Sequence, residues 1–223
     1  MRVLHVKDLG LVHPEVSVAK DREILERCIA TGECILHFYR REPPAVSVGH
    51  GEKIEEAVYV ERCKEDGVII IQRESAGSAI YTDRNTLEYA IALPEKLVPF
   101  DRKQSYEFLC KPIVEALNTL GYPVVFKPIN DIQMEGKKVS GSAQKRSRGA
   151  VLQHGTILLV VDHEKMDRYL KVTPKLAEKG LGKHSERVKG LFEHHKVNES
   201  RIVDEIARNY ESLIEAKIVL PHQ

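Results

Sequence analysis

Two runs of small residues, each close to a basic side chain, are the first candidates for chemistry in this sequence. Lys138 stands two residues before Ser140-Gly141-Ser142, and Arg73 stands two residues before Ser75-Ala76-Gly77-Ser78. Main-chain N–H groups without bulky side chains can approach an anion, and a cation beside them would hold it. Neither run has the Gly-Lys-Ser/Thr order of a Walker loop or a GxGxxG pattern. The spacing allows an anion-binding backbone, and it equally allows two tight turns between strands.

Two more polar segments could complete such a site. Asn130 and Asp131 follow the apolar run 124–126, and residues 153–156 read Gln-His-Gly-Thr. Carboxylate and amide oxygens are the ligands that hard cations such as Mg²⁺ prefer. The sequence therefore predicts that Asn130 and Asp131 could hold a metal ion beside a phosphate.

Other polar residues do not form a recognisable motif. His184, His194 and His195 lack the spacing of metal ligands, so we interpret them as part of a solvated helix face. Ser140 and Ser142 are not framed by the GxSxG pattern of a nucleophile elbow.

The elements that must position these residues follow from apolar spacing. Helices are expected over 15–31, 54–66 and 103–120, with a kink or break at Pro112, and the last sixty residues are expected to be mostly helical. Strands are expected at 35–39, 45–48, 68–71, 79–81, 86–93, 124–126 and 138–139, and within 149–161. Strands crowd the middle without strict βαβ alternation, so the sequence predicts an α+β fold. We expect a mixed or antiparallel central β-sheet flanked by helices.

Composition narrows the class of protein. The chain has 223 residues, of which 42% are apolar, enough for a sizeable core. Lys+Arg 34 against Asp+Glu 33 gives a net charge of +1, which argues against nucleic acid as a partner. No apolar run reaches the roughly 18 residues of a membrane span, and the first residues do not resemble a signal peptide. The four cysteines form no CxxC pair, so we expect buried free thiols and a cytoplasmic location.

The candidate segments together resemble the lipoate–protein ligase A family, within the biotin/lipoyl ligase group. Residues 72–83 are similar to its motif Arg-Arg-x-x-Gly-Gly-Gly-Ala-Val-(aromatic)-His-Asp, with Gln72, Ala76, Ser78 and Thr82 as departures. Residues 136–144 and 154–158 match Gly-Lys-Lys-(Ile/Val)-Ser-Gly-Ser-Ala-Gln and His-Gly-Thr-Leu-Leu almost without change. The family's Asn-Asp pair matches residues 130–131, 48–50 resemble Ile-Gly-Arg, and 179–188 resemble a later segment. The resemblance implies a single catalytic domain over 1–223, in a short form without the family's C-terminal accessory domain.

What the resemblance implies about activity is a two-step reaction. Lipoate attacks the α-phosphate of ATP to give lipoyl-AMP, and a lysine of an acceptor domain then takes the lipoyl group. Lys138 is the expected catalytic cation, Asn130 and Asp131 the expected Mg²⁺ ligands, and Val46, Val48 and Tyr81 the expected walls around the lipoyl tail. The resemblance assigns binding of ATP or substrate to Arg73, Ser75, Ala76, Gly77, Ser78, Tyr81, Asp83, Asn130, Lys138, Ser140, Gly141, Ser142, His154, Gly155 and Thr156.

The resemblance also implies partners. The acceptor would be the lipoyl domain of a 2-oxoacid dehydrogenase or the glycine cleavage H protein, and a separate small accessory subunit would assist adenylation. One alternative is an octanoyl or lipoyl transferase that moves the acyl group from a carrier protein without ATP. Such an enzyme needs an accessible cysteine thiolate. The nearest thiol upstream of Lys138 is Cys110, which lies in the predicted helix 103–120 and is therefore expected in the core. A biotin ligase is disfavoured because its Gly-Arg-Gly-Arg-x-Gly stretch is absent. A second alternative is a lipoyl-binding protein in which the motif departures have weakened catalysis.

Overall fold

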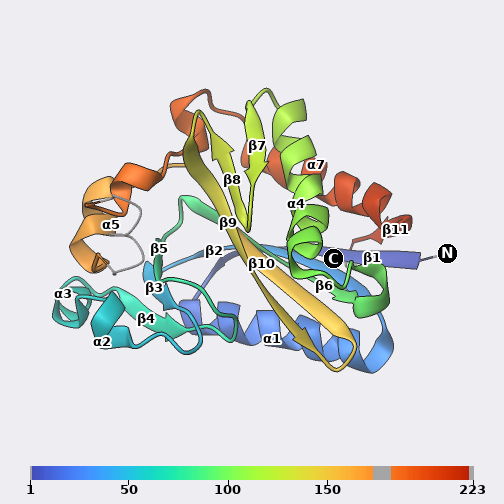
Figure 1. The fold of residues 1–223 in the computed structure, drawn as a ribbon, viewed down its shortest axis with the longest axis horizontal. Helices are drawn as coiled ribbons and strands as arrows, with labels where there is room; N and C mark the ends of the chain where they lie inside the picture. Colours follow the sequence, from blue (N-terminus) through green and yellow to red (C-terminus); the bar gives the residue numbers. More distant parts are fainter. Residues whose placement is uncertain (1, 173–181, 221–223) are drawn as a thin grey trace.

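The computed structural model describes residues 2–172 and 182–220, and this part of the chain is built around a large mixed β-sheet (Figure 1). Its strands are β1 (Arg2–Val12), β2 (Cys34–Arg41), β6 (Thr86–Pro94), β7 (Val124–Lys127), β8 (Asp131–Met134), β9 (Lys137–Ser147), β10 (Ala150–Leu158) and β11 (Ala216–Val219). The spatial order is β11-β1-β2-β6-β10-β9-β8-β7. Strand β1 is parallel to both neighbours, and every other neighbouring pair in this sheet is antiparallel. The expected α+β fold with a mixed central sheet flanked by helices is confirmed.

A second, smaller sheet lies beside the first. It consists of β3 (Ala45–Val48), β4 (Ile69–Gln72) and β5 (Ile80–Thr82) in the order β4-β3-β5. The short helices α2 (Ile54–Ala57), α3 (Val60–Glu65) and α5 (His163–Tyr169) lie next to it (Figure 1).

The single helix expected over 54–66 is wrong, because the chain leaves the helix between α2 and α3. Val58 forms a β-bridge with Leu170, and the Tyr59 N–H donates to the Tyr169 carbonyl. The Lys171 N–H donates to the Ala57 carbonyl on the other side of this bridge. Pairing with the distant segment 169–171 satisfies backbone groups that a continuous helix would have used.

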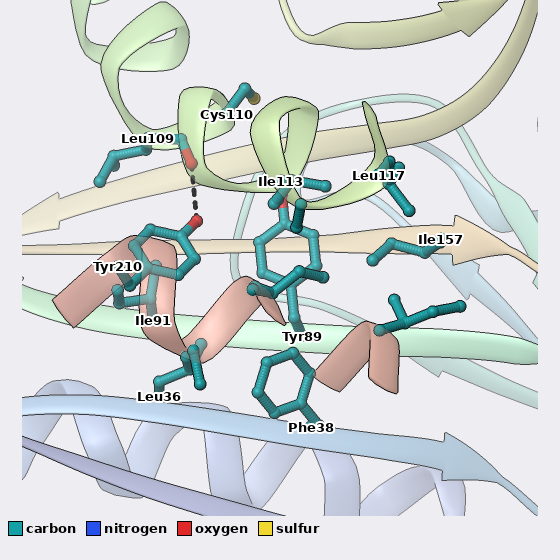
Figure 2. Packing of buried hydrophobic residues seen from close by; sticks show 14 of the residues in the cluster. Leu36, Phe38, Tyr89, Ile91, Leu109, Cys110, Ile113, Leu117, Ile157 and Tyr210 are labelled. Carbon is teal, nitrogen blue, oxygen red and sulfur yellow. Dashed lines mark hydrogen bonds between the residues drawn. The ribbon is translucent and has the colours of Figure 1, made fainter. Parts of the chain in front are cut away.

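Helices cover both faces of the large sheet, and β6 shows how. Tyr89 and Ile91 point toward α4 (Arg102–Thr119) and α7 (Glu199–Leu213), where they belong to the largest apolar cluster (Figure 2). Ala90 and Ala92 point to the opposite face and pack with residues of α1 (Pro14–Thr31). Successive residues of a strand face opposite sides, so a strand that is covered on both sides is apolar throughout.

Pro112 lies inside α4, and the expected break there is wrong. The structure keeps one helix from Arg102 to Thr119. A proline removes one helical N–H and disturbs the carbonyls one turn before it. Helix α7 compensates, because the Tyr210 hydroxyl donates to the Leu109 carbonyl at 2.6 Å (Figure 2). The Asn209 amide donates to the Pro112 carbonyl at 3.2 Å.

The end of the chain is less helical than its apolar spacing indicates. Besides α5 and α7, the described part of this region has only the 3₁₀ turns η2 (Ser185–Arg187) and η3 (Leu191–Glu193) and the strand β11. A further 3₁₀ turn, η1 (Glu95–Leu97), follows β6. Among the described residues, no helix combines the length and apolar character that crossing a membrane would need.

Candidate functional site

A cavity of about 210 Å³ lies between the two sheets. Its floor is a row of four residues on neighbouring strands of the large sheet, here called the floor row. The register pairs Glu88 with Thr156, Thr156 with Gly141, and Gly141 with Asp131. Residues directly opposite each other in an antiparallel sheet face the same side, so all four face the cavity. The middle of the row is small, which leaves room above it.

Most of the predicted site residues line this cavity, although they come from four separate segments. Those that do are Arg73, Ala76, Gly77, Ser78, Tyr81, Asn130, Asp131, Lys138, Gly141, Ser142, His154, Gly155 and Thr156.

Asp131 is the outer end of the floor row, and it forms an ion pair with Lys138. The Lys138 ammonium lies 2.9 Å from Asp131 Oδ1, and the Arg187 guanidinium donates to Asp131 Oδ2. Burial lowers the pKa of Lys138, and Arg187 lowers it further, against the attraction of Asp131. Burial alone would raise the pKa of Asp131, but Lys138 and Arg187 outweigh it and hold that pKa below its ordinary value. Two cations therefore share one ionised carboxylate, and an excess of positive charge faces the cavity.

Gly141 makes room for the Lys138 ammonium. A Cβ built on Gly141 would lie 2.1 Å from Lys138 Nζ. The bare backbone in the sequence Lys-Val-Ser-Gly-Ser is thus needed at Gly141, where the lysine side chain folds back over its own strand.

The predicted Mg²⁺ site at Asn130 and Asp131 does not fit a resident metal ion as the residues are arranged. Asp131 is already paired with the Lys138 and Arg187 cations, which a metal ion would have to displace. The Asn130 amide nitrogen donates to the Ser142 carbonyl at 2.6 Å, which leaves only its amide oxygen as a possible ligand. Among the described residues, no group of three or more His, Cys, Asp or Glu side chains could hold a metal.

Arg73 was predicted to face an anion, and its guanidinium also organises the loop 76–78. It donates to the Ser47 carbonyl at 2.8 Å and to the Ser78 carbonyl at 3.0 Å. Burial lowers the pKa of Arg73 to about 10. Gly77 has φ 124°, and a Cβ there would lie 2.8 Å from the guanidinium. Arg73 therefore holds the small-residue loop against the cavity.

Three predicted binding residues lie outside the cavity lining. Ser75 turns away, and its hydroxyl lies 2.5 Å from His154 Nε2. Asp83 shapes the following turn, where its carboxylate accepts from the Asn85 N–H at 2.8 Å. Ser140 is a neighbour of Gly141 on β9, so its side chain faces the opposite side of the sheet. The binding roles of these three residues stay predictions that the cavity lining does not support.

The expected walls around the acyl tail are partly wrong. Val46 and Val48 lie in an apolar cluster of the small sheet, and Ser47 between them faces the cavity instead. Val46 pairs with Tyr81 on β5, and both belong to the cluster that contains the cavity residues Leu158 and Met166, so Val46 packs among wall residues without itself lining the cavity. Tyr81 does line the cavity. The remaining apolar wall comes from residues that were not predicted to be walls: Leu158, Met166, Leu170 and Val188.

Other residues of the site were also missed. His184 lines the cavity, although its spacing indicates a solvated helix face, and Arg187 stood out only as part of the segment 179–188. Lys179 and Gly180 of that segment lie outside the described residues. His154 Nδ1 lies 2.7 Å from Asp21 Oδ2, and no motif in the sequence connects the two. This bond, with the Ser75 contact, fixes the plane of the His154 ring.

The inner end of the floor row carries a buried ion pair, Arg41 with Glu88. Arg41 Nη2 lies 2.9 Å from Glu88 Oε2, and the two side chains are only 4% and 6% exposed. Burial raises the pKa of Glu88 to about 7, although Arg41 and Thr82 act in the opposite direction. The sequence did carry a signal, because Glu88 is the one charged residue within the strand Thr86–Leu93.

Glu88 should make the stability of the protein fall as pH rises. An acid whose pKa is raised on folding stabilises the fold fully below its unfolded pKa, and the contribution is lost as pH rises through about 7. The shift corresponds to at most about 3 kcal/mol of unfolding free energy. Urea unfolding of the wild type and Glu88→Gln between about pH 5 and pH 8 measures it.

The comparison with the variant is needed because His37 acts in the opposite direction. Burial lowers the pKa of His37 to about 4, so its contribution is lost as pH falls below its ordinary value. Both proteins carry His37, so the wild type should lose stability relative to Glu88→Gln as pH rises. Parallel curves would contradict the prediction.

Similarity to known proteins extends over most of the chain. Residues 13–211 match the family model of the lipoyl protein ligase A/B catalytic domain. A probable lipoate-protein ligase A of Mycoplasma pneumoniae is 31% identical over 161 residues, which are 72% of this chain and 47% of that protein. The octanoyltransferase LipM of Staphylococcus epidermidis is 23% identical over 92% of this chain and 80% of its own length. The chain thus spans about half the length of the Mycoplasma relative.

Solved structures share the fold. A bi-partite lipoate protein ligase from Thermoplasma acidophilum, studied with its E2 lipoyl domain, superimposes with a TM-score of 0.83 at 23% identity, covering 100% of this chain and 86% of that one. A lipoate-protein ligase A bound with ATP gives a TM-score of 0.83 at 21% identity, covering 100% and 90%. With the family model matching nearly the whole chain, this protein belongs to the lipoyl protein ligase A/B catalytic domain family.

Proposed function

We propose that this protein is a lipoate–protein ligase, which activates lipoate with ATP and transfers the lipoyl group to a lysine of a lipoyl-domain acceptor. The observation that carries the proposal is the Lys138 ammonium, folded over Gly141 inside a cavity with an apolar wall. A fixed cation in a partly buried site stabilises negative charge that develops in a transition state. The apolar wall suits the acyl chain that would lie beside it.

In the first step the lipoate carboxylate attacks the α-phosphate of ATP, and pyrophosphate leaves. Lys138 and Arg187 meet the negative charge of the phosphate, while Asp131 holds both cations in place. The loop Ala76-Gly77-Ser78 offers bare backbone beside this end of the cavity. In the second step the acceptor amine attacks the acyl carbon, AMP leaves, and the Lys138 ammonium stabilises the acyl oxygen.

The cysteines favour ligation over transfer through a thioester. All four lie within the described residues, all are buried, and none lines the cavity. The Cys110 sulfur lies 3.3 Å from the hydroxyl of the cavity residue Ser142, and burial raises the pKa of this thiol to about 11. A thioester intermediate requires an accessible thiolate at neutral pH. Octanoyltransferase LipM is nevertheless among the relatives, so transfer from a carrier protein is the second candidate.

A direct assay separates the candidate functions. The protein is incubated with lipoate, MgATP and a lipoyl-domain acceptor, with and without a small accessory protein, and pyrophosphate and acceptor mass are followed. Pyrophosphate release with lipoylation of the acceptor is the expected result. We include the accessory protein because the Thermoplasma ligase is described as bi-partite. Transfer from an acyl carrier without ATP would establish the transferase instead, and lipoate binding without turnover would indicate a binding protein.

A further inference from the structure

The floor row has a charged pair at each end, and the proposed chemistry uses only one of them. Lys138 with Asp131 occupies the outer end, and Arg41 with Glu88 occupies the inner end. Glu88 is two strands away from Gly141, over which the Lys138 ammonium lies. Neighbouring strands are about 4.8 Å apart, so the two ends are separated by roughly 10 Å. This separation suits an extended medium-chain acyl group with its carbonyl at Lys138.

The inner pair is well held but incompletely satisfied. Arg41 donates to the Ser17 hydroxyl at 2.9 Å, to the Thr82 hydroxyl at 3.0 Å, and pairs with Glu88 Oε2. Glu88 Oε1 is buried and has no hydrogen-bond partner among residues 2–172 and 182–220. Both side chains nevertheless line the cavity. A buried carboxylate oxygen without a donor is costly, so a ligand that supplied one would gain affinity.

We propose that Glu88 and Arg41 form a distal subsite for a neutral hydroxyl or thiol at the far end of a medium-chain acyl substrate. The inference rests on the proposed function, because that function places the acyl carbonyl at Lys138. Above the raised pKa of Glu88 the pair is ionised on both sides and cancels its own charge, so at that pH it gives no preference to an ion. A hydroxyl or thiol donates to Glu88 Oε1, whereas a terminal methyl group leaves this oxygen unsatisfied. Reduced lipoate, with its thiols, and an ω-hydroxy acid share this chemistry.

Equilibrium binding without ATP tests the subsite. We expect dihydrolipoate, ω-hydroxyoctanoate, or both to bind at least about tenfold more tightly than octanoate. Whichever of these two acids, dihydrolipoate or ω-hydroxyoctanoate, binds more tightly identifies the preferred donor as a thiol or a hydroxyl.

The double variant Arg41→Met with Glu88→Leu is the decisive comparison. Removing one partner alone would leave a buried unpaired charge, whereas replacing both with apolar residues of similar size is often tolerated. In this variant octanoate should bind more tightly than the donor-bearing acids. A matched control changes Lys20→Met with Glu23→Leu, a more exposed pair on α1, and should keep the wild-type preference.

Equal binding of all acids by the wild type, or the same preference in the double variant, would overturn the subsite. Pyrophosphate release with the same acids, measured separately, keeps the two proposals apart. Release that does not distinguish octanoate from the donor-bearing acids supports the ligase and overturns the subsite. Selective binding without pyrophosphate release, also when the small accessory protein is present, supports the subsite and overturns the ligase.

Discussion

Lys138→Ala should lower the rate of pyrophosphate release about a hundred- to a thousandfold, the size of effect seen when one transition-state donor is removed. The Lys138 ammonium lies over Gly141 inside the cavity, so its loss removes the cation that is held at this point of the floor row. The fold should survive, because Asp131 keeps its ion pair with Arg187. The measurement is lipoate-dependent pyrophosphate release, together with a thermal unfolding midpoint.

Two companion variants test whether the position of the ammonium matters. Lys137→Ala removes the neighbouring lysine, which is exposed and faces the other side of β9, and should leave the rate unchanged. Gly141→Ala keeps the lysine but places a Cβ 2.1 Å from where Nζ lies, so the flexible ammonium must move. We expect Gly141→Ala to lose most of the activity at nearly unchanged stability. Full turnover in Lys138→Ala would refute the catalytic assignment.

Gly49→Ala should destabilise the fold far more than Lys138→Ala or Gly141→Ala. A Cβ on Gly49 would lie 1.9 Å from the Gly77 carbonyl oxygen and 2.9 Å from its carbon. These are backbone atoms of the loop 76–78. The Arg73 guanidinium donates both to the Ser78 carbonyl of this loop and to the Ser47 carbonyl of β3, and so fixes the loop against β3. Neither the backbone at residue 49 nor the backbone at Gly77 can move without breaking hydrogen bonds, so we expect a loss of about 3 kcal/mol of unfolding free energy. Urea denaturation gives the number.

Gly182→Ala is the matched control. Among the residues that the structure describes, its Cβ would meet only the Glu186 carboxylate, at 3.8 Å or more, which is ordinary contact. Its stability should stay within about 0.5 kcal/mol of the wild type. If Gly49→Ala were equally stable, the contact between residue 49 and the loop 76–78 would not exist in solution.

The central strands and long helices were predictable because their signals are local. Helix α1 carries its own end signal in Gly32, which adopts φ 73° and donates to the Cys28 carbonyl. The break after Ala57 and the continuity of α4 through Pro112 were not predictable. Both depend on hydrogen bonds from segments about a hundred residues away in sequence, and local periodicity contains no record of such partners.

The same difference between local and distant signals separates the site residues that were predicted from those that were not. Lys138 and the small residues around it form a contiguous motif, so their importance could be read from the sequence. Ser75 and Asp83 belong to a matching motif too, yet only the structure reveals that their side chains contact His154 and the Asn85 N–H outside the cavity lining. Arg41 and Glu88 are 47 positions apart and meet only because β2 pairs with β6.

The burial of all four thiols has a practical consequence. Cys63 lies in the small-sheet cluster, Cys28 in the cluster beneath α1, and Cys34 and Cys110 in the largest cluster. A buried thiol is alkylated only when its surroundings open, so its labelling rate reports the free energy of that opening. The chain therefore carries a built-in reporter in each of its three cores. Mass spectrometry of alkylated peptides would show which core of a variant such as Gly49→Ala opens first.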